Sequence, residues 1–219
     1  MTQEATGFLY PFLDAEERDQ DSLLTDLAAS ARAKAAESAA LRRSTLEDCA
    51  ALIEEAGAEL ARRFAAGGRM FTFGNGGSST DAATLAALFA HPPLNRALPA
   101  WSLTADQAVL TALGNDVGFD LVFARQLIAR ADAGDIAVAM STSGSSRDLT
   151  VAFAEAKHRG MYTVGFAGYD GGQFAESNDV DVCLVVRSQS VHRVQEAQAL
   201  VGYSLWAAVH DHLPELETR

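Results

Sequence analysis

The stretch Gly74-Asn75-Gly76-Gly77-Ser78-Ser79-Thr80 consists only of glycine, asparagine, serine and threonine. It follows the strand-like run 69–73 and precedes an alanine-rich, helical stretch. Glycines let the backbone turn tightly and approach a ligand, hydroxyl groups form hydrogen bonds, and a helix N-terminus presents unpaired N–H groups. The stretch therefore predicts a strand-to-helix loop with the properties of an anion-binding site.

A second loop of the same kind, Ser141-Thr142-Ser143-Gly144-Ser145-Ser146, follows the apolar run 136–140 and again opens a helix. Each loop alone is also explained as an ordinary turn, the first by glycines at positive φ and the second by a capping serine. Two such loops at the ends of two parallel strands favour a phosphorylated small molecule that binds between them.

Short apolar runs alternate with helical patterns from residue 68 onward. The pattern predicts strands at 69–74, 98–103, 135–141, 161–166 and 181–186. It predicts helices at 78–90, 106–113, 118–130, 147–158 and 191–212. This alternation is typical of an α/β protein, a three-layer αβα sandwich whose five-stranded parallel sheet is covered on both faces.

The region before the first strand has helical periodicity only. We expect two amphipathic helices there, the second beginning near Ser44. The predicted domains are an N-terminal helical segment, 1–45, and the α/β domain, 46–219.

Composition excludes several classes of protein. The net charge of −12 argues against a nucleic-acid surface, and no apolar run reaches the ~20 residues of a membrane span. Residues 1–20 have no signal-peptide pattern, which predicts a cytoplasmic protein. Cys49 and Cys183 lack metal-ligand spacing and are interpreted as small buried hydrophobes of a reduced compartment.

Four motifs together resemble the sugar isomerase (SIS) domain family. They are Gly74–Ser78, Gly114-Asn115-Asp116, Ser141–Ser146 and Arg193-Val194-Gln195-Glu196. The likeness is closest to the sedoheptulose 7-phosphate isomerases, or phosphoheptose isomerases, and the DnaA-binding initiator-associating protein has the same plan. The resemblance implies a flavodoxin-like αβα fold, a sugar phosphate ligand and a homotetramer.

The resemblance also implies roles for individual residues. It places Ser141, Ser143 and Ser146 on the phosphate and Thr142 near the sugar. The other residues that it implies at the substrate are Asn75, Gly76, Ser78, Asp106 and Gln195.

The chain departs from the isomerases at their catalytic and zinc-binding positions. Thr84 and Leu88 stand where the family has a histidine and the glutamate base, and Tyr203 replaces a second histidine. Leucine cannot move a proton, and the retained Gln195 alone cannot hold zinc, which needs three or four ligands. We therefore expect no metal and no cofactor.

The catalytic residues are unknown, and three weak candidates for proton carriers are Asp106, His192 and Glu196. Each has a plainer explanation: Asp106 starts a helix, His192 lies in solvent at a helix start, and Glu196 supports a neighbouring helix or subunit.

Two functions remain open. One is ketose–aldose isomerisation of a sedoheptulose 7-phosphate-like substrate, and the other is a non-catalytic, sugar-phosphate-responsive module that binds a protein partner. A nucleotide-binding Rossmann protein is disfavoured because the first loop lacks G-x-G-x-x-G spacing.

Overall fold

The computed structural model describes residues 20–213. The chain divides into two compact units, Met1–Ala40 and Leu41–Arg219. The expected absence of a signal peptide concerns residues 1–20, of which only Gln20 lies in the described part of the chain. Within 20–213, no helix combines the length and the apolar character needed to cross a membrane.

A single helix, α1 (Gln20–Ala65), replaces the two helices expected before the first strand. The break predicted near Ser44 does not occur, because its hydroxyl donates to Leu41 O at 3.1 Å within the helix instead of capping a new N-terminus. No proline interrupts α1, and its one glycine is Gly57.

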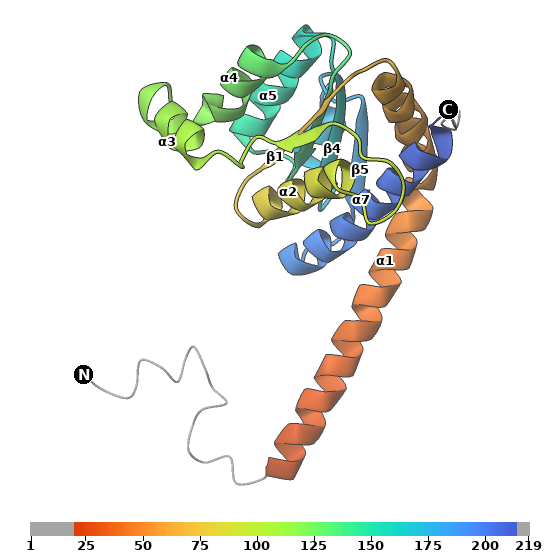
Figure 1. Cartoon of the computed structure of the whole chain (residues 1–219). Helices are drawn as coiled ribbons and strands as arrows, with labels where there is room; N and C mark the ends of the chain where they lie inside the picture. The colour runs from red at the N-terminus through yellow and green to blue at the C-terminus, as the bar shows by residue number, and fades with distance from the viewer. Residues whose placement is uncertain (1–19, 214–219) are drawn as a thin grey trace, which may run out of the picture. The chain divides into compact units, whose positions relative to one another are not determined.

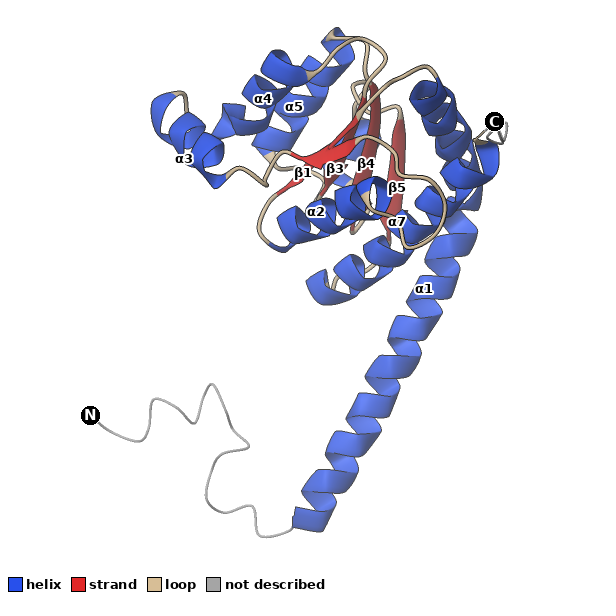
Figure 2. Ribbon diagram, in the orientation of Figure 1, coloured by secondary structure: helices blue, strands red, loops and turns tan. Residues whose placement is uncertain are grey.

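As predicted, the sheet has five parallel strands, which lie between the helices in Figures 1 and 2. Their order is β2-β1-β3-β4-β5. The strands are β1 (Met70–Gly74), β2 (Ala100–Ser102), β3 (Ile136–Met140), β4 (Tyr162–Gly168) and β5 (Val182–Val186). Since parallel neighbours need crossover connections, helices link the strands and cover the sheet.

The helices follow the predicted alternation. They are α2 (Gly77–Ala90), α3 (Gln107–Asp116), α4 (Val122–Arg130), α5 (Arg147–His158) and α7 (Val191–His212). Two short elements were not expected, the 3₁₀ turn η3 (Phe119–Leu121) and the helix α6 (Gly172–Glu176).

Two apolar clusters make the three layers. Alternate residues of β3 face opposite sides: Ile136 and Val138 pack with residues of α1, α2 and α7, whereas Ala137 and Ala139 pack with residues of α4 and α5. The centre of the sheet is thus buried on both faces, which explains why β3 is continuously apolar.

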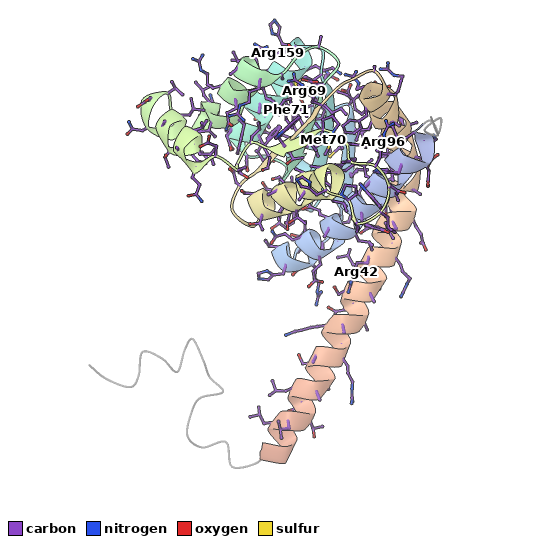
Figure 3. All side chains as sticks on the ribbon, viewed as in Figure 1. Arg42, Arg69, Met70, Phe71, Arg96 and Arg159 are labelled. Carbon is purple, nitrogen blue, oxygen red and sulfur yellow. The ribbon has the colours of Figure 1, made fainter. Side chains whose placement is uncertain are left out.

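An ionic contact joins the starts of β1 and β3. Arg69, just before β1, pairs with the buried carboxylate of Asp135, just before β3, with Nη2 and Oδ2 2.8 Å apart. The Arg69 backbone N–H also donates to Asp135 Oδ1 at 2.8 Å, and its guanidinium lies over the Phe71 ring (Figure 3). These bonds fix the register of β1 and β3 at the N-terminal ends of the two strands.

The two cysteines were expected to be small buried hydrophobes. Cys49 is buried and Cys183 half-buried, both as free thiols, and burial raises the pKa of the Cys183 thiol to about 12. Trp206 is buried, whereas Trp101 stacks on Phe71 at the sheet edge and remains half exposed.

The aromatic core predicts a clear contrast in stability. Phe153 is buried between Phe73 and Phe174, with ring centroids at 5.7 and 4.9 Å, whereas Phe119 is 61% exposed. Phe153→Ala should lower the free energy of unfolding by about 3–5 kcal/mol, and Phe119→Ala by roughly 0.5 kcal/mol or less. Urea denaturation of both variants measures the difference; equal losses would contradict this packing.

Candidate functional site

Both polar loops leave the sheet at the point where its strand order reverses. β1 and β3 are neighbours in register, and Gly74 at the end of β1 pairs with Met140 at the end of β3. β2 lies on the outer side of β1, while β4 and β5 extend beyond β3. In open α/β sheets this reversal opens a crevice beyond the carboxyl ends of the strands, where ligands bind.

The first loop positions Asn75, Gly76 and Ser78. Gly76 caps α2 with φ of 54°, a backbone conformation that favours glycine. Asn75 Nδ2 donates to Asp148 Oδ1 at 3.0 Å, which links this loop to the start of α5. Ser78 is buried in the first turn of α2.

The second loop is tied together by its own hydroxyl groups. Ser141 Oγ accepts from the Gly144 N–H at 3.0 Å, and Ser143 Oγ accepts from the Ser145 N–H at 3.3 Å. Gly144 has φ of 64°, and a Cβ there would collide with the Gly171 carbonyl. Ser146 is the N-cap of α5 but makes no side-chain hydrogen bond to the helix. Its hydroxyl therefore remains available at the helix N-terminus.

A buried carboxylate follows the second loop, in the first turn of α5. Asp148 is 4% exposed, and its Oδ2 has no hydrogen-bond partner among the described residues. Burial raises the pKa of this carboxyl, while the hydrogen bond from Asn75 and nearby backbone N–H groups of α5 oppose the shift. The hydrogen bond to Asp148 fixes the direction of the Asn75 amide.

Gln195 of α7 lies against the start of α2. Its Nε2 donates to Asp81 Oδ2 at 2.8 Å, and a Cβ at Gly77 would collide with the same amide. Asp81 has the residue type of a helix cap, but α2 begins at Gly77, and the Asp81 carboxylate accepts the hydrogen bond from Gln195 instead. The structure thus places the motif Arg193–Glu196 next to the loop Gly74–Ser78.

The three candidate proton carriers are all exposed. Asp106 is the N-cap of α3 and accepts from the Val109 N–H at 3.1 Å, as its plainer interpretation predicted. His192 and Glu196 lie on the exposed face of α7. None of the three lines the cavity described next, and their catalytic role remains a prediction.

A cavity of about 70 Å³ lies beside the two loops, between α2 and α7. It is lined by Asp81, Thr84, Leu85, Leu88, Met140, Gln198, Ala199, Gly202 and Tyr203. Thr84, Leu88 and Tyr203, the three positions at which the sequence interpretation expects a departure from the isomerases, therefore share one cavity. Between residues 20 and 213, no group of three or more histidine, cysteine, aspartate or glutamate side chains is arranged to hold a metal ion.

The sequence interpretation missed Gln198. This fully buried side chain donates from Nε2 to Ser141 O at 2.8 Å and so joins α7 to the second loop. The available signal was a polar residue among the apolar positions Val194, Ala197 and Val201 of the predicted last helix.

Comparisons with known proteins agree with this geometry. The family model described as SIS domain matches residues 35–168. Phosphoheptose isomerase of Rhodospirillum rubrum is 39% identical over 170 residues, 77% of this chain and 89% of the relative. That of Solidesulfovibrio magneticus is 40% identical over 185 residues, 82% of this chain and 87% of the relative.

A solved structure shows the same arrangement of elements. Phosphoheptose isomerase GmhA from Neisseria gonorrhoeae matches with a TM-score of 0.78 and 32% identity, over 84% of this chain and 99% of that one. The extent of the family match and the identity to these relatives establish the relationship. This chain belongs to the SIS domain family, where it is similar to the phosphoheptose isomerases.

Proposed function

We propose that this chain binds a sugar phosphate in the crevice between the loops that follow β1 and β3. The observation that carries the proposal is the convergence of Asn75–Ser78 and Ser141–Ser146 at the reversal of strand order. The relatives named phosphoheptose isomerase support a phosphorylated sugar as the ligand class.

The second loop would hold the phosphate without a basic side chain. Hydroxyl groups of Ser141, Ser143 and Ser146 and the amides at the start of α5 are suited to an anion, and the helix dipole favours negative charge there. The nearby Arg147 pairs with Asp120 at 2.7 Å and is exposed. Local dipoles thus allow phosphate binding by a chain whose net charge is −12.

The remaining assignments concern the sugar. We assign contacts with its hydroxyl groups to Asn75, Gly76, Ser78, Asp106, Thr142 and Gln195. The Asn75–Asp148 and Gln195–Asp81 hydrogen bonds support this assignment by fixing two of these amides.

Ketose–aldose isomerisation is the reaction that the relatives' names suggest. It requires a base that carries a proton between C1 and C2 of the sugar. Leu88 offers no such group, so turnover would depend on Asp106, His192 or Glu196 as proton carriers.

The lining of the cavity favours a second candidate, a non-catalytic module that responds to a sugar phosphate and binds a protein partner. Leu88 and Leu85 supply no proton carrier, and Thr84 donates its hydroxyl to Thr80 O at 2.9 Å. A binding protein needs the phosphate loop but not a base.

Other features complete the proposal. The ligand-binding domain is 46–219, the protein is cytoplasmic, and it uses neither a metal nor a cofactor. It binds neither nucleic acid nor membrane directly, in keeping with its acidic charge. We propose a homotetramer, which the exposed Leu24 and Leu27, one helical turn apart on α1, support.

Removing a hydroxyl from the second loop should weaken binding. Ser143→Ala should lower the affinity for sedoheptulose 7-phosphate by about 1–3 kcal/mol, because a charged phosphate loses a donor. Isothermal titration calorimetry measures the change. Ser44→Ala, which removes an exposed hydroxyl of α1, is the matched control and should bind as the unaltered chain does. Unchanged affinity in Ser143→Ala would contradict the phosphate assignment.

Proton exchange separates the two candidate functions. With sedoheptulose 7-phosphate in deuterated water, we expect no loss of carbon-bound proton signals beyond the buffer rate, because Leu88 replaces the family's base. Proton NMR over several hours makes the measurement. Exchange above the buffer rate would assign isomerase activity, and loss of that exchange in Asp106→Asn, His192→Ala or Glu196→Gln would identify the carrier.

Light scattering tests the tetramer. The chain of 23.2 kDa should elute with about four times that mass, and Leu24→Glu with Leu27→Glu should reduce the mass by placing charges in an apolar interface. A monomeric mass for the unaltered chain would rule the tetramer out. An unchanged tetramer in the double variant would place the interface elsewhere.

A further inference from the structure

We propose that the cavity between α2 and α7 receives the acetamido group of an N-acetylated amino sugar phosphate. The inference rests on the proposed function, because it takes the phosphate of the same ligand to be held by Ser141–Ser146. It goes further by naming the substituent that distinguishes this ligand from a fully hydroxylated sugar phosphate.

The inner surface of the cavity is apolar. Leu85, Leu88 and Met140 line it, and the aromatic ring of Tyr203, itself packed on Trp206, forms part of its exposed rim. A sugar hydroxyl in contact with these side chains would lose water without gaining a hydrogen bond. A methyl group there instead removes apolar surface from water.

Acceptors adjoin this apolar surface. Asp81 lines the cavity and uses Oδ2 to receive Gln195, while no hydrogen bond to its Oδ1 is seen among the described residues. Gln198 also lines the cavity, and its buried Oε1 has no partner in that part of the chain. An acetamido group combines an N–H donor with a methyl group, which matches an acceptor beside an apolar wall.

The cavity is continuous with the phosphate loop. Met140 lines the cavity and the next residue, Ser141, begins the loop, while Gln198 bonds to Ser141 O at 2.8 Å. One ligand can therefore reach both. The cavity volume of about 70 Å³ is small, which suits a substituent of the size of an acetyl group better than a nucleobase or a second sugar.

A glycine helps to keep the cavity open. A Cβ at Gly202 of α7 would lie 3.2 Å from Leu85 Cδ1, with no other heavy atom of the described chain within 4 Å outside the neighbouring residues and backbone of α7 itself. Gly202→Ala would therefore add a methyl group at the cavity wall with little disturbance of the helix. The substitution reduces the volume of the cavity without changing its polarity, so it tests the fit of the acetamido group by size alone.

Calorimetry with matched ligands tests the proposal. The probes are N-acetylglucosamine 6-phosphate, N-acetylmannosamine 6-phosphate, glucosamine 6-phosphate, glucose 6-phosphate, mannose 6-phosphate and sedoheptulose 7-phosphate. At least one acetamido ester should bind about tenfold or more tightly than its hydroxyl and amino counterparts, as expected for a small apolar group in a fitted pocket. Leu88→Asn and Gly202→Ala should each abolish this preference, whereas Leu94→Asn, at an exposed loop position, should keep it.

The outcomes separate the inference from the proposed function. If all the esters bind alike and Ser143→Ala weakens each of them, the phosphate site stands and the acetamido assignment is overturned. Tighter binding of glucosamine 6-phosphate would overturn it in favour of a charge contact with Asp81. If no ester binds, the proposed function fails and the inference fails with it. Should Leu88→Asn lose its circular dichroism spectrum, Gly202→Ala alone decides.

Discussion

The in-register pairing of β1 with β3 is the constraint on which the site depends. Gly74 and Met140 end the two strands opposite each other, so both loops start at the same level of the sheet. At the other end of the strands, Arg69 and Asp135 fix the same register. A slip of one residue would turn every β1 side chain to the other face and separate the loops. The glycine at the end of β1 is required as well, because a Cβ there would lie 2.7 Å from Met140 O.

Much of this arrangement could be predicted from local patterns. Apolar runs bounded by glycine and serine identify β1 and β3. The polar loops after them identify the carboxyl ends of these strands as the place where a ligand would bind. Long-range contacts could not be predicted in this way. Ser44 and Asp81 have the residue types of helix starts, yet one bonds within α1 and the other receives Gln195, 114 residues away. Gln198 owes its importance to Ser141, a neighbour known only once the chain is folded.

Binding and chemistry draw on different parts of this fold. The second loop, Ser141–Ser146, which is proposed to hold the phosphate, is a backbone turn with short hydroxyl side chains. It is held by its own hydrogen bonds and by Gly171 packed against Gly144. The cavity, in contrast, is lined mainly by side chains from α2 and α7, whose backbone bonds are satisfied within each helix, together with Met140 at the end of β3. Apart from Gln198, which bonds to Ser141 O, the lining residues of the two helices can therefore change without removing a hydrogen bond of the second loop.

The side chains that line the cavity are also compatible with one another. A carboxylate in place of Leu88 alone would enter a cavity lined by Leu85 and Met140 that already contains Asp81. Burial and the like charge of Asp81 would both raise its pKa and make its ionised form costly, and among the described residues no lysine, arginine or histidine lines the cavity to offset this cost. Leu88 carries neither cost, because an apolar side chain suits a wall that it shares with Leu85 and Met140.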